Sequence, residues 1–445
     1  MAALLAGCKT TVDRARQAQA DGDRLPGETV VTASQAGLTA NRIFTLAELE
    51  GIALTNHPSL LKARQAVESA RLQARITHAG RLPRISASGA YNRSTRNTQA
   101  DRGHTEASGS WSAGIGLDLL LHDWGRLAAE ERQALEALIA AEQQLRDTDL
   151  EIACGVRTAF FERHRSVHLL RVAIESENQY AQHLAEARTM VEIGTRRPYD
   201  ATKAEVDWGN ARLAIVTASN ALTVAHAQLN RALGLAESPA YRIAAATLPA
   251  AQKDSDAWLA DARADAPSLA VFRARERAAS AYVDQTIAEL YPELTLGANA
   301  DLSGRGFPLA WNFSWALRLA QNIFDGHRKT ARIDDAVTQL RTARANAADA
   351  EQTLYLNLVN AVAARESARK RADISRLIQK QAEDNLAIVN EQYRVGSSSS
   401  IERTDAQVAL TQAQSDVIRA DYDEQTAIAQ ILRLAGQGLA QTGND

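Results

Sequence analysis

Asn56-His57-Pro58-Ser59-Leu60 returns later in the chain as Asp265-Ala266-Pro267-Ser268-Leu269, and this repetition decides the fold. Arg81-Leu82-Pro83 and Leu290-Tyr291-Pro292 have the same separation of 209 residues. Farther along, Asp123-Trp124-Gly125-Arg126 matches Asp325-Gly326-His327-Arg328 at a separation of 202 residues, as Gly194 matches Gly396. The second copy is therefore seven residues shorter than the first, and the shortening falls between Pro292 and Asp325. One structural unit is therefore used twice, over 58–235 and 267–437.

Composition excludes several classes of protein. The 445 residues carry a net charge of −3, with both signs mixed along the chain, so there is no basic footprint for nucleic acid. No run of about 18 apolar residues occurs, which excludes a helix that spans a membrane. Short strands with one apolar face remain compatible with a spanning β-barrel.

Each copy begins with helix and continues with a hairpin. Thr45 is predicted to cap a helix whose first turn contains Glu48, with a break near Pro58 and a stop at Pro83. Side chains then alternate between apolar and polar, which indicates strands of about nine to eleven residues. We expect a polar loop from Arg93 to Ser110 between the first two strands. The apolar faces carry Ile85, Ala87, Gly89 and Tyr91, then Trp111 to Leu121, and in the second copy Leu294 to Leu302 and Trp311 to Leu319.

Two hairpins supply only four strands. Such a sheet could pack on a soluble core, which is the commoner origin of this alternation. The rest of the chain has no further strand-like sequence to complete a sandwich, and four strands cannot close a barrel. We therefore expect other copies of the chain to complete the structure.

A very long helical segment follows each hairpin. Arg126–Ile193 and Arg328–Val395 each contain 68 residues without proline, about 100 Å of helix. Each ends at a glycine suited to a left-handed C-cap, Gly194 or Gly396. Shorter helices are expected to return over about 200–233 and 402–434. The predicted organisation is a tether (1–44), a first repeat (45–236), an irregular connector (237–257), a second repeat (258–437) and a tail (438–445).

The two cysteines, Cys8 and Cys154, form no disulfide framework or metal cluster in the sequence. Cys8 follows Leu5-Ala6-Gly7, which is similar to the cleavage signature of bacterial lipoproteins, so we expect Cys8 to be lipidated. An accidental match is the alternative, because the preceding segment is short and has no positive residue.

Two motifs resemble one family. Ile323-Phe324-Asp325-Gly326-His327-Arg328 is similar to the barrel-to-helix step of the TolC family of outer-membrane efflux proteins. Tyr393-Arg394-Val395-Gly396, followed by Glu402 and Asp405, resembles that family's helical tip. Order, spacing and duplication extend the resemblance from about Thr45 to Gln437. It makes Asp123, Gly125, Asp325 and Gly326 the junction between barrel and helices.

The resemblance implies a mainly α-helical fold with a small β part. Three copies would form a 12-stranded β-barrel in the outer membrane of a Gram-negative bacterium, and an α-helical barrel in the periplasm. The channel would be the exit duct of a tripartite efflux or type I secretion system. Its partners would be a periplasmic adaptor, an inner-membrane pump of RND or ABC type, and outer-membrane lipid; the cargo stays open among drugs, metal ions and proteins.

The resemblance also implies roles at the tips. Glu402 and Asp405 share a helix face at i, i+3 and would form a ring of six carboxylates at the closed end, which raises proton affinity and favours cations. A solvated helix face is the alternative. Asp200 would help to latch the tips, although it also fits an ordinary N-cap. Where the family often has an arginine, this chain has Ser398, so Arg196 or Arg197 would have to replace it. The tips expected to dock an adaptor comprise Gly194, Thr195, Arg196, Gly396 and Ser397.

Rival functions find little support. His164 and His168 are spaced i, i+4, but no acidic or cysteine partner completes a metal site, and no nucleophile has an adjacent base. The sequence thus predicts no enzyme, cofactor or metal. A periplasmic coiled-coil adaptor or a scaffold without a pore is the alternative function.

Overall fold

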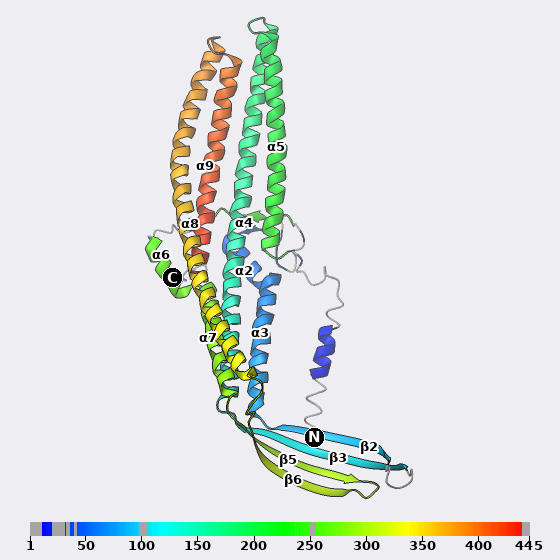
Figure 1. The fold of residues 1–445 in the computed structure, drawn as a ribbon. Coiled ribbons are helices and arrows are strands. Elements are labelled where there is room, and N and C mark those ends of the chain that lie inside the picture. Colours follow the sequence, from blue (N-terminus) through cyan, green and yellow to red (C-terminus); the bar gives the residue numbers. More distant parts are fainter. Residues whose placement is uncertain are drawn as a thin grey trace, which may run out of the picture. The chain divides into compact units, whose positions relative to one another are not determined.

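A computed structural model describes residues 11–19, 32, 36–39, 42–97, 105–235, 237, 239–248 and 255–437. Its elements occur in the duplicated order that the sequence predicts (Figure 1). The first copy contains α2 (Leu46–Asn56), α3 (Pro58–His78), the short 3-10 helix η2 (Ala79–Arg81), β2 (Arg84–Asn97), β3 (Thr105–His122), α4 (Arg126–Glu192) and α5 (Pro198–Ala232). The second contains α6 (Ser255–Asp265), α7 (Pro267–Ala288), β5 (Glu293–Gly304), β6 (Ala310–Ala320), α8 (Arg328–Arg394) and α9 (Ser400–Leu434).

The predicted start of the first helix is confirmed. Thr45 accepts a hydrogen bond from the amide of Glu48, and the Glu48 carboxylate accepts one from the amide of Thr45 at 2.8 Å. This capping box satisfies two amides that the first helical turn leaves unpaired. The helix breaks at His57, whose backbone is extended before Pro58.

The four long strands form one antiparallel sheet in the order β2-β3-β5-β6. The predicted faces are confirmed, since the ladder places Ile85 opposite Leu117 and Ala300 opposite Phe313. The predicted strand lengths are wrong for the first hairpin, because β2 has 14 residues and β3 has 18. Residues that we expected in a polar loop, Arg93–Asn97 and Thr105–Ser110, continue the ladder instead. Their polar side chains do not prevent pairing, which depends on the backbone.

The connector and the tether are also more ordered than expected. Ile43–Phe44 (β1) pairs in parallel with Arg242–Ile243 (β4), and Phe44 is only 2% exposed. Residues 11–19 are helical, and α6 begins at Ser255 inside the predicted connector. The limits at 44 and 257 therefore need correction. Cys8 and the predicted tail 438–445 lie outside the described residues.

The chain divides into two compact units, and each draws on both copies of the repeat. One unit comprises 1–62, 146–266 and 353–445, and the other comprises 63–145 and 267–352. The helices α4 and α8 contribute to both. Among the described residues, no helix combines the length and apolar character needed to cross a membrane.

A buried ion pair organises the first unit. Arg157 on α4 donates to both carboxylate oxygens of Glu50 on α2, at 2.7 and 3.3 Å. Their side chains are 1% and 5% exposed. Burial raises the pKa of Glu50, while the hydrogen bonds and charge of Arg157 oppose that rise. In the second unit, Glu131 on α4 accepts from Arg81 at 2.7 Å and so ties the end of α3 to α4.

Replacing Glu50 with alanine should destabilise the protein by about 3–5 kcal/mol, because it leaves a buried guanidinium without a partner. Thermal unfolding in detergent, followed by circular dichroism, measures the change. The double variant E50L/R157M removes both charges and should recover most of the loss. Equal losses in the single and double variants would contradict this role for the pair.

Candidate gate at the helical tips

The two hairpin tips have the same backbone structure. Gly194 has φ +81° and Gly396 has φ +82°, the left-handed conformation predicted for a glycine C-cap. The amide of Thr195 donates to the carbonyl of Met190 at 2.9 Å, and that of Ser397 donates to Gln392 at 2.9 Å. These bonds satisfy carbonyls that the last helical turn leaves free. The turns between α4 and α5 and between α8 and α9 are therefore rigid local structures.

One arginine bridges the two turns. The guanidinium of Arg196 donates to the carbonyl oxygens of Tyr393 and Ser398, both at 3.0 Å. It also lies over the ring of Tyr393, 4.4 Å from the centroid. Arg403 lies over the same ring at 4.8 Å, and Tyr393 is only 2% exposed. Cation–π contacts in a desolvated position stabilise this arrangement.

Arg403 connects three helices. On α9, it donates to Asn390 of α8 at 2.8 Å and to Glu186 of α4 at 2.7 Å. The residue is 8% exposed, so its charge is largely removed from water and depends on these partners. Glu186, Asn390 and Arg403 could not be predicted from the sequence, since they meet only after the hairpins pack together. Tyr393 was part of a recognised motif, but nothing in that motif indicated its arginine contacts.

Acidic residues of α5 make two further bridges to α9. Asp200 accepts a hydrogen bond from the Ser400 hydroxyl at 2.7 Å. Asp207 accepts from Thr404 at 2.9 Å and from Lys203 at 2.7 Å. Asp200 is therefore not the N-cap of α5, a position that Arg197 occupies, but lies in its first turn and contacts α9. We name the contacts of Arg196, Tyr393, Arg403, Asp200 and Asp207 across the two hairpins the tip latch.

Glu402 takes part in a local cap. Its carboxylate accepts from the Ser398 hydroxyl and from the amide of Ser399, at 3.0 Å in the second case. The hydrogen bond from Ser398, followed by that from the Ser399 amide, lowers the pKa of Glu402. Within one chain, these hydrogen bonds thus favour the ionised carboxylate. The higher proton affinity expected for Glu402 would have to come from the carboxylates of other copies. Glu402 and Asp405 are both exposed on α9.

The departure at Ser398 has a structural explanation. Its side chain is 4% exposed and donates to Glu402, while its carbonyl receives Arg196. Arg196 reaches the second tip from the first, as one of the two predicted substitutes. Arg197 is exposed, and its side chain has no hydrogen bond or ion pair in the part of the chain that the structure describes.

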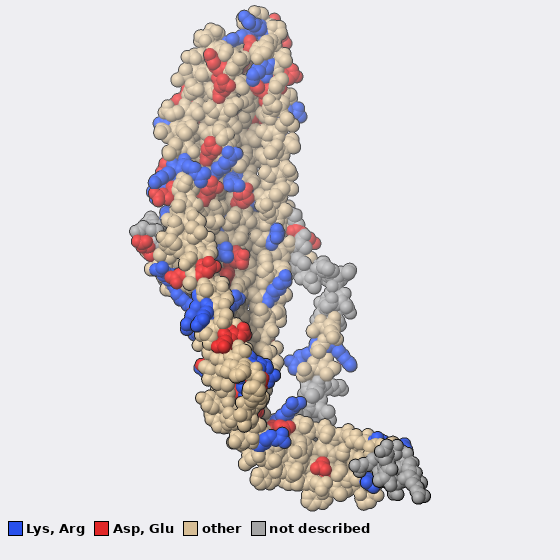
Figure 2. All heavy atoms as spheres, viewed as in Figure 1, with Lys and Arg blue, Asp and Glu red and all other residues tan. Residues whose placement is uncertain are grey.

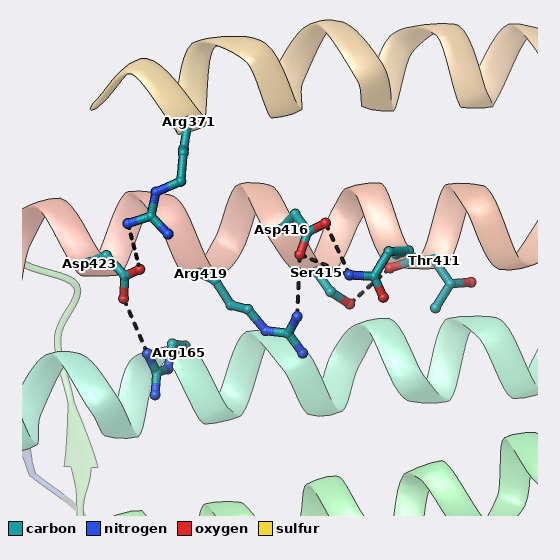
Figure 3. A network of polar contacts seen from close by, with 8 residues as sticks. Arg165, Arg371, Thr411, Ser415, Asp416, Arg419 and Asp423 are labelled. Carbon is teal, nitrogen blue, oxygen red and sulfur yellow. Dashed lines mark hydrogen bonds and ion pairs between the residues drawn. The ribbon is translucent and has the colours of Figure 1, made fainter. Parts of the chain in front are cut away.

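Farther from the tip, an ionic network fixes the same helices (Figure 3). Asp423 on α9 lies between two arginines and accepts from Arg165 of α4 at 3.4 Å and from Arg371 of α8 at 3.2 Å. Asp416 accepts from Arg419 on its own helix at 3.3 Å. The helices α4, α8 and α9 are therefore joined by polar contacts both at the tip and farther along their length.

The junctions between sheet and long helices also repeat. Trp124 and Gly125 have φ of 54° and 93°, and the matching Gly326 and His327 have 70° and 67°. Asp123 accepts from the amide of Leu127 at 2.7 Å, and Asp325 accepts from that of Arg328 at 3.0 Å. Each aspartate thus caps its long helix, after two residues in the left-handed region.

The rival metal site is not assembled. His164 uses Nε2 to contact the carbonyl oxygen of Ala244 at 3.0 Å, and its ring stacks on Tyr422. No cluster of three or more potential metal ligands occurs within the described ranges.

Comparison with known proteins decides the family. Residues 49–235 and 258–437 match the model of the family described as outer membrane efflux protein. The chain belongs to this family. The two matched ranges nearly coincide with the two copies of the repeat, and this outer-membrane efflux protein is a transport channel that extends into the periplasm.

Relatives of the efflux protein span most of its length. It is 24% identical over 426 residues to the toluene efflux pump outer membrane protein TtgC of Pseudomonas putida, covering 89% of this chain and 84% of TtgC. It is 23% identical to the probable outer membrane lipoprotein SilC of Salmonella typhimurium, covering 89% and 86%. The CmeC outer membrane channel of Campylobacter jejuni has the same fold, with a TM-score of 0.81, 16% identity and coverage of 90% and 87%.

Replacing Arg196 with methionine should loosen the tips. The change removes two charge-assisted hydrogen bonds, each of which stabilises by about 1.5–3 kcal/mol. The fraction of time that a channel is open should therefore rise about tenfold or more, measured from single-channel recordings in planar bilayers. Arg197→Met is the matched control, since Arg197 is the exposed neighbour. Equal open fractions in the two variants would remove Arg196 from the tip latch.

Acid should weaken the tip through His183 of α4, which lines a small cavity together with Asp207, Tyr393 and Arg403. Burial lowers the pKa of His183 from 6.5 to about 4, and Arg403 adds to the effect. Since the folded protein excludes a proton that the unfolded chain binds, stability should fall as the pH drops from about 6.5 to about 4. His183→Gln should reduce this fall in the unfolding temperature. An unchanged pH dependence in the variant would contradict the assignment.

Proposed function

We propose that three copies of this chain form the exit duct of a tripartite efflux system, closed at rest by the tip latch. The observation that carries the proposal is a set of apolar surfaces that one chain leaves uncovered. They occur on the sheet and on the long helices, in patterns that fit contact with lipid or with another copy.

The first uncovered surface lies on α5. Val206, Leu213, Val216 and Val224 are 56%, 65%, 65% and 49% exposed. The first three have the spacing of a heptad seam, which normally packs against another helix. These side chains stay exposed among the elements that the structure describes.

A second uncovered surface lies on α8. Ile374, Leu377 and Ile388 are 59%, 62% and 57% exposed, again at heptad spacing. The chain runs toward the α8–α9 turn in α8 and away from the α4–α5 turn in α5. Packing α5 of one copy against α8 of the next would pair the seams antiparallel. Repetition of this heterologous contact closes a ring of helices.

The sheet also leaves an apolar face and two strand edges without a partner. Trp311, Phe313 and Trp315 of β6 are 77%, 62% and 65% exposed on one face. The outer strands β2 and β6 each have an edge that pairs with no other described strand. Joining β6 of each copy to β2 of the next gives twelve strands without an edge, with the apolar face toward lipid. An adaptor or scaffold without a pore would have no use for this face.

The partners follow from the family. An inner-membrane pump would deliver cargo through a periplasmic adaptor that contacts the turns at Gly194, Thr195, Arg196, Gly396 and Ser397. The cargo and the pump type, RND or ABC, stay open. Lipidation of Cys8 remains part of the proposal, supported by the lipoprotein name of the relative SilC.

The gate is tested by neutral substitutions of the acidic pair. Glu402→Gln keeps a side chain that can complete the capping box, and Asp405→Asn keeps the shape of the carboxylate. If the six carboxylates form a ring, the double variant should show weaker block by divalent cations and lower cation selectivity in planar bilayers. Glu391→Gln is the control, because Glu391 is exposed and pairs locally with Arg394. Wild-type block and selectivity in the double variant would contradict the ring.

A further inference from the structure

The apolar face of the sheet contains a cleft. Ala87, Ala113 and Ala300 form its floor, on three neighbouring strands. Ile115, Trp311 and Phe313 stand beside this floor and make a hollow of about 630 Å³. The ladder places Ile115 opposite both Ala87 and Ala300, and Phe313 opposite Ala300, so these side chains share one face.

Aromatic rings lie on the same face beyond one end of the cleft. Tyr91 and Trp111 are cross-strand partners with ring centroids 4.5 Å apart. Phe307, in the turn between β5 and β6, lies 6.5 Å from Trp111 and is exposed. Rings of this kind mark the boundary between the apolar core of a membrane and its headgroups.

Two arginines come immediately beyond these rings. Arg93 is two residues past Tyr91 on β2 and therefore points to the same face. Arg305 follows Gly304, the partner of Trp111, and is the first residue after β5, so the alternation of the strand no longer fixes its face. Since β2 and β5 are separated only by β3, the two backbones are about 10 Å apart. Figure 2 shows a largely uncharged sheet with basic side chains at both of its ends, one of them away from the helices.

Both arginines are exposed, and neither guanidinium has a hydrogen bond or ion pair to a side chain that the structure describes. A guanidinium pairs with phosphate in a fork geometry and so binds it more specifically than an ammonium group. The cleft, the rings and the arginines thus follow one another along the strands. The acyl chains, the membrane boundary and the phosphate headgroups of a lipid leaflet follow one another in the same order.

We propose that this face binds lipopolysaccharide of the outer leaflet, with an acyl chain of lipid A in the alanine-floored cleft and its phosphates on Arg93 and Arg305. The inference rests on the proposed barrel, which directs this face to lipid. The helices extend into the periplasm, and β2 begins and β6 ends beside them. Arg93 lies nine residues beyond the start of β2, so it is on the side of the outer leaflet.

A neighbouring copy does not fit this surface as well. In a closed barrel, copies join through the edges of β2 and β6, and the cleft lies on a face between those edges. A phospholipid of the periplasmic leaflet would place its headgroup at the opposite end of the strands, away from Arg93 and Arg305.

The test titrates purified wild-type trimers with Kdo2-lipid A and, separately, with palmitoyl-oleoyl phosphatidylglycerol, and counts bound lipids by native mass spectrometry. Wild type should prefer Kdo2-lipid A, and the affinity of R93Q/R305Q for it should be lower by about tenfold or more. Arg318→Gln is the control, since Arg318 is on the opposite face of β6. It should bind as wild type does.

A second pair of variants tests the cleft. A113L/A300L fills the floor and should also weaken binding of Kdo2-lipid A, whereas Ala298→Leu, on the same face outside the cleft, should not. Unchanged binding in R93Q/R305Q, or equal affinity of wild type for both lipids, would overturn the site. Conductance of the same preparations separates the two proposals: a channel that conducts but ignores Kdo2-lipid A contradicts only the lipid site, whereas a wild type that neither assembles nor conducts contradicts the duct.

Discussion

A sheet of four strands with one apolar face and two open edges is the constraint on which the rest of this structure depends. Backbone groups at an open edge and aromatic rings on an open face both require a partner. The chain offers none, because its other long elements are helices with uncovered seams of their own. The sheet and the helices therefore call for the same solution, which is repetition of the chain around an axis.

Much of this was predictable because local chemistry repeats at fixed separations. The capping box at Thr45, the left-handed glycines at Gly194 and Gly396, and the aspartate caps before both long helices depend on residues close in sequence. The extent of β2 and β3 was not predictable in this way. Their outer halves are polar, and what holds them in the ladder is pairing between backbones.

The tip shows where local reasoning ends. Glu402 and Asp405 were predicted from the resemblance to the family's helical tip, and their predicted ring has no counterpart within one chain. The contact between Arg403 and Glu186 joins residues 217 positions apart, so no spacing rule could reveal it. The two copies have diverged here: the first tip supplies the bridging Arg196, while the second supplies Tyr393 and the capped turn that receive it. Duplication thus provides two similar hairpins, and the residues in which they differ form the tip latch between them.

The most direct test of this account is the number of chains per particle after mild detergent extraction from outer membranes. Native mass spectrometry should find three, and aspartate in place of both Leu213 and Ile374 should shift the particle toward single chains, because it places charges in the seams between copies. A wild-type protein that is monomeric, with its sheet protected from membrane-soluble labels, would contradict the central claim.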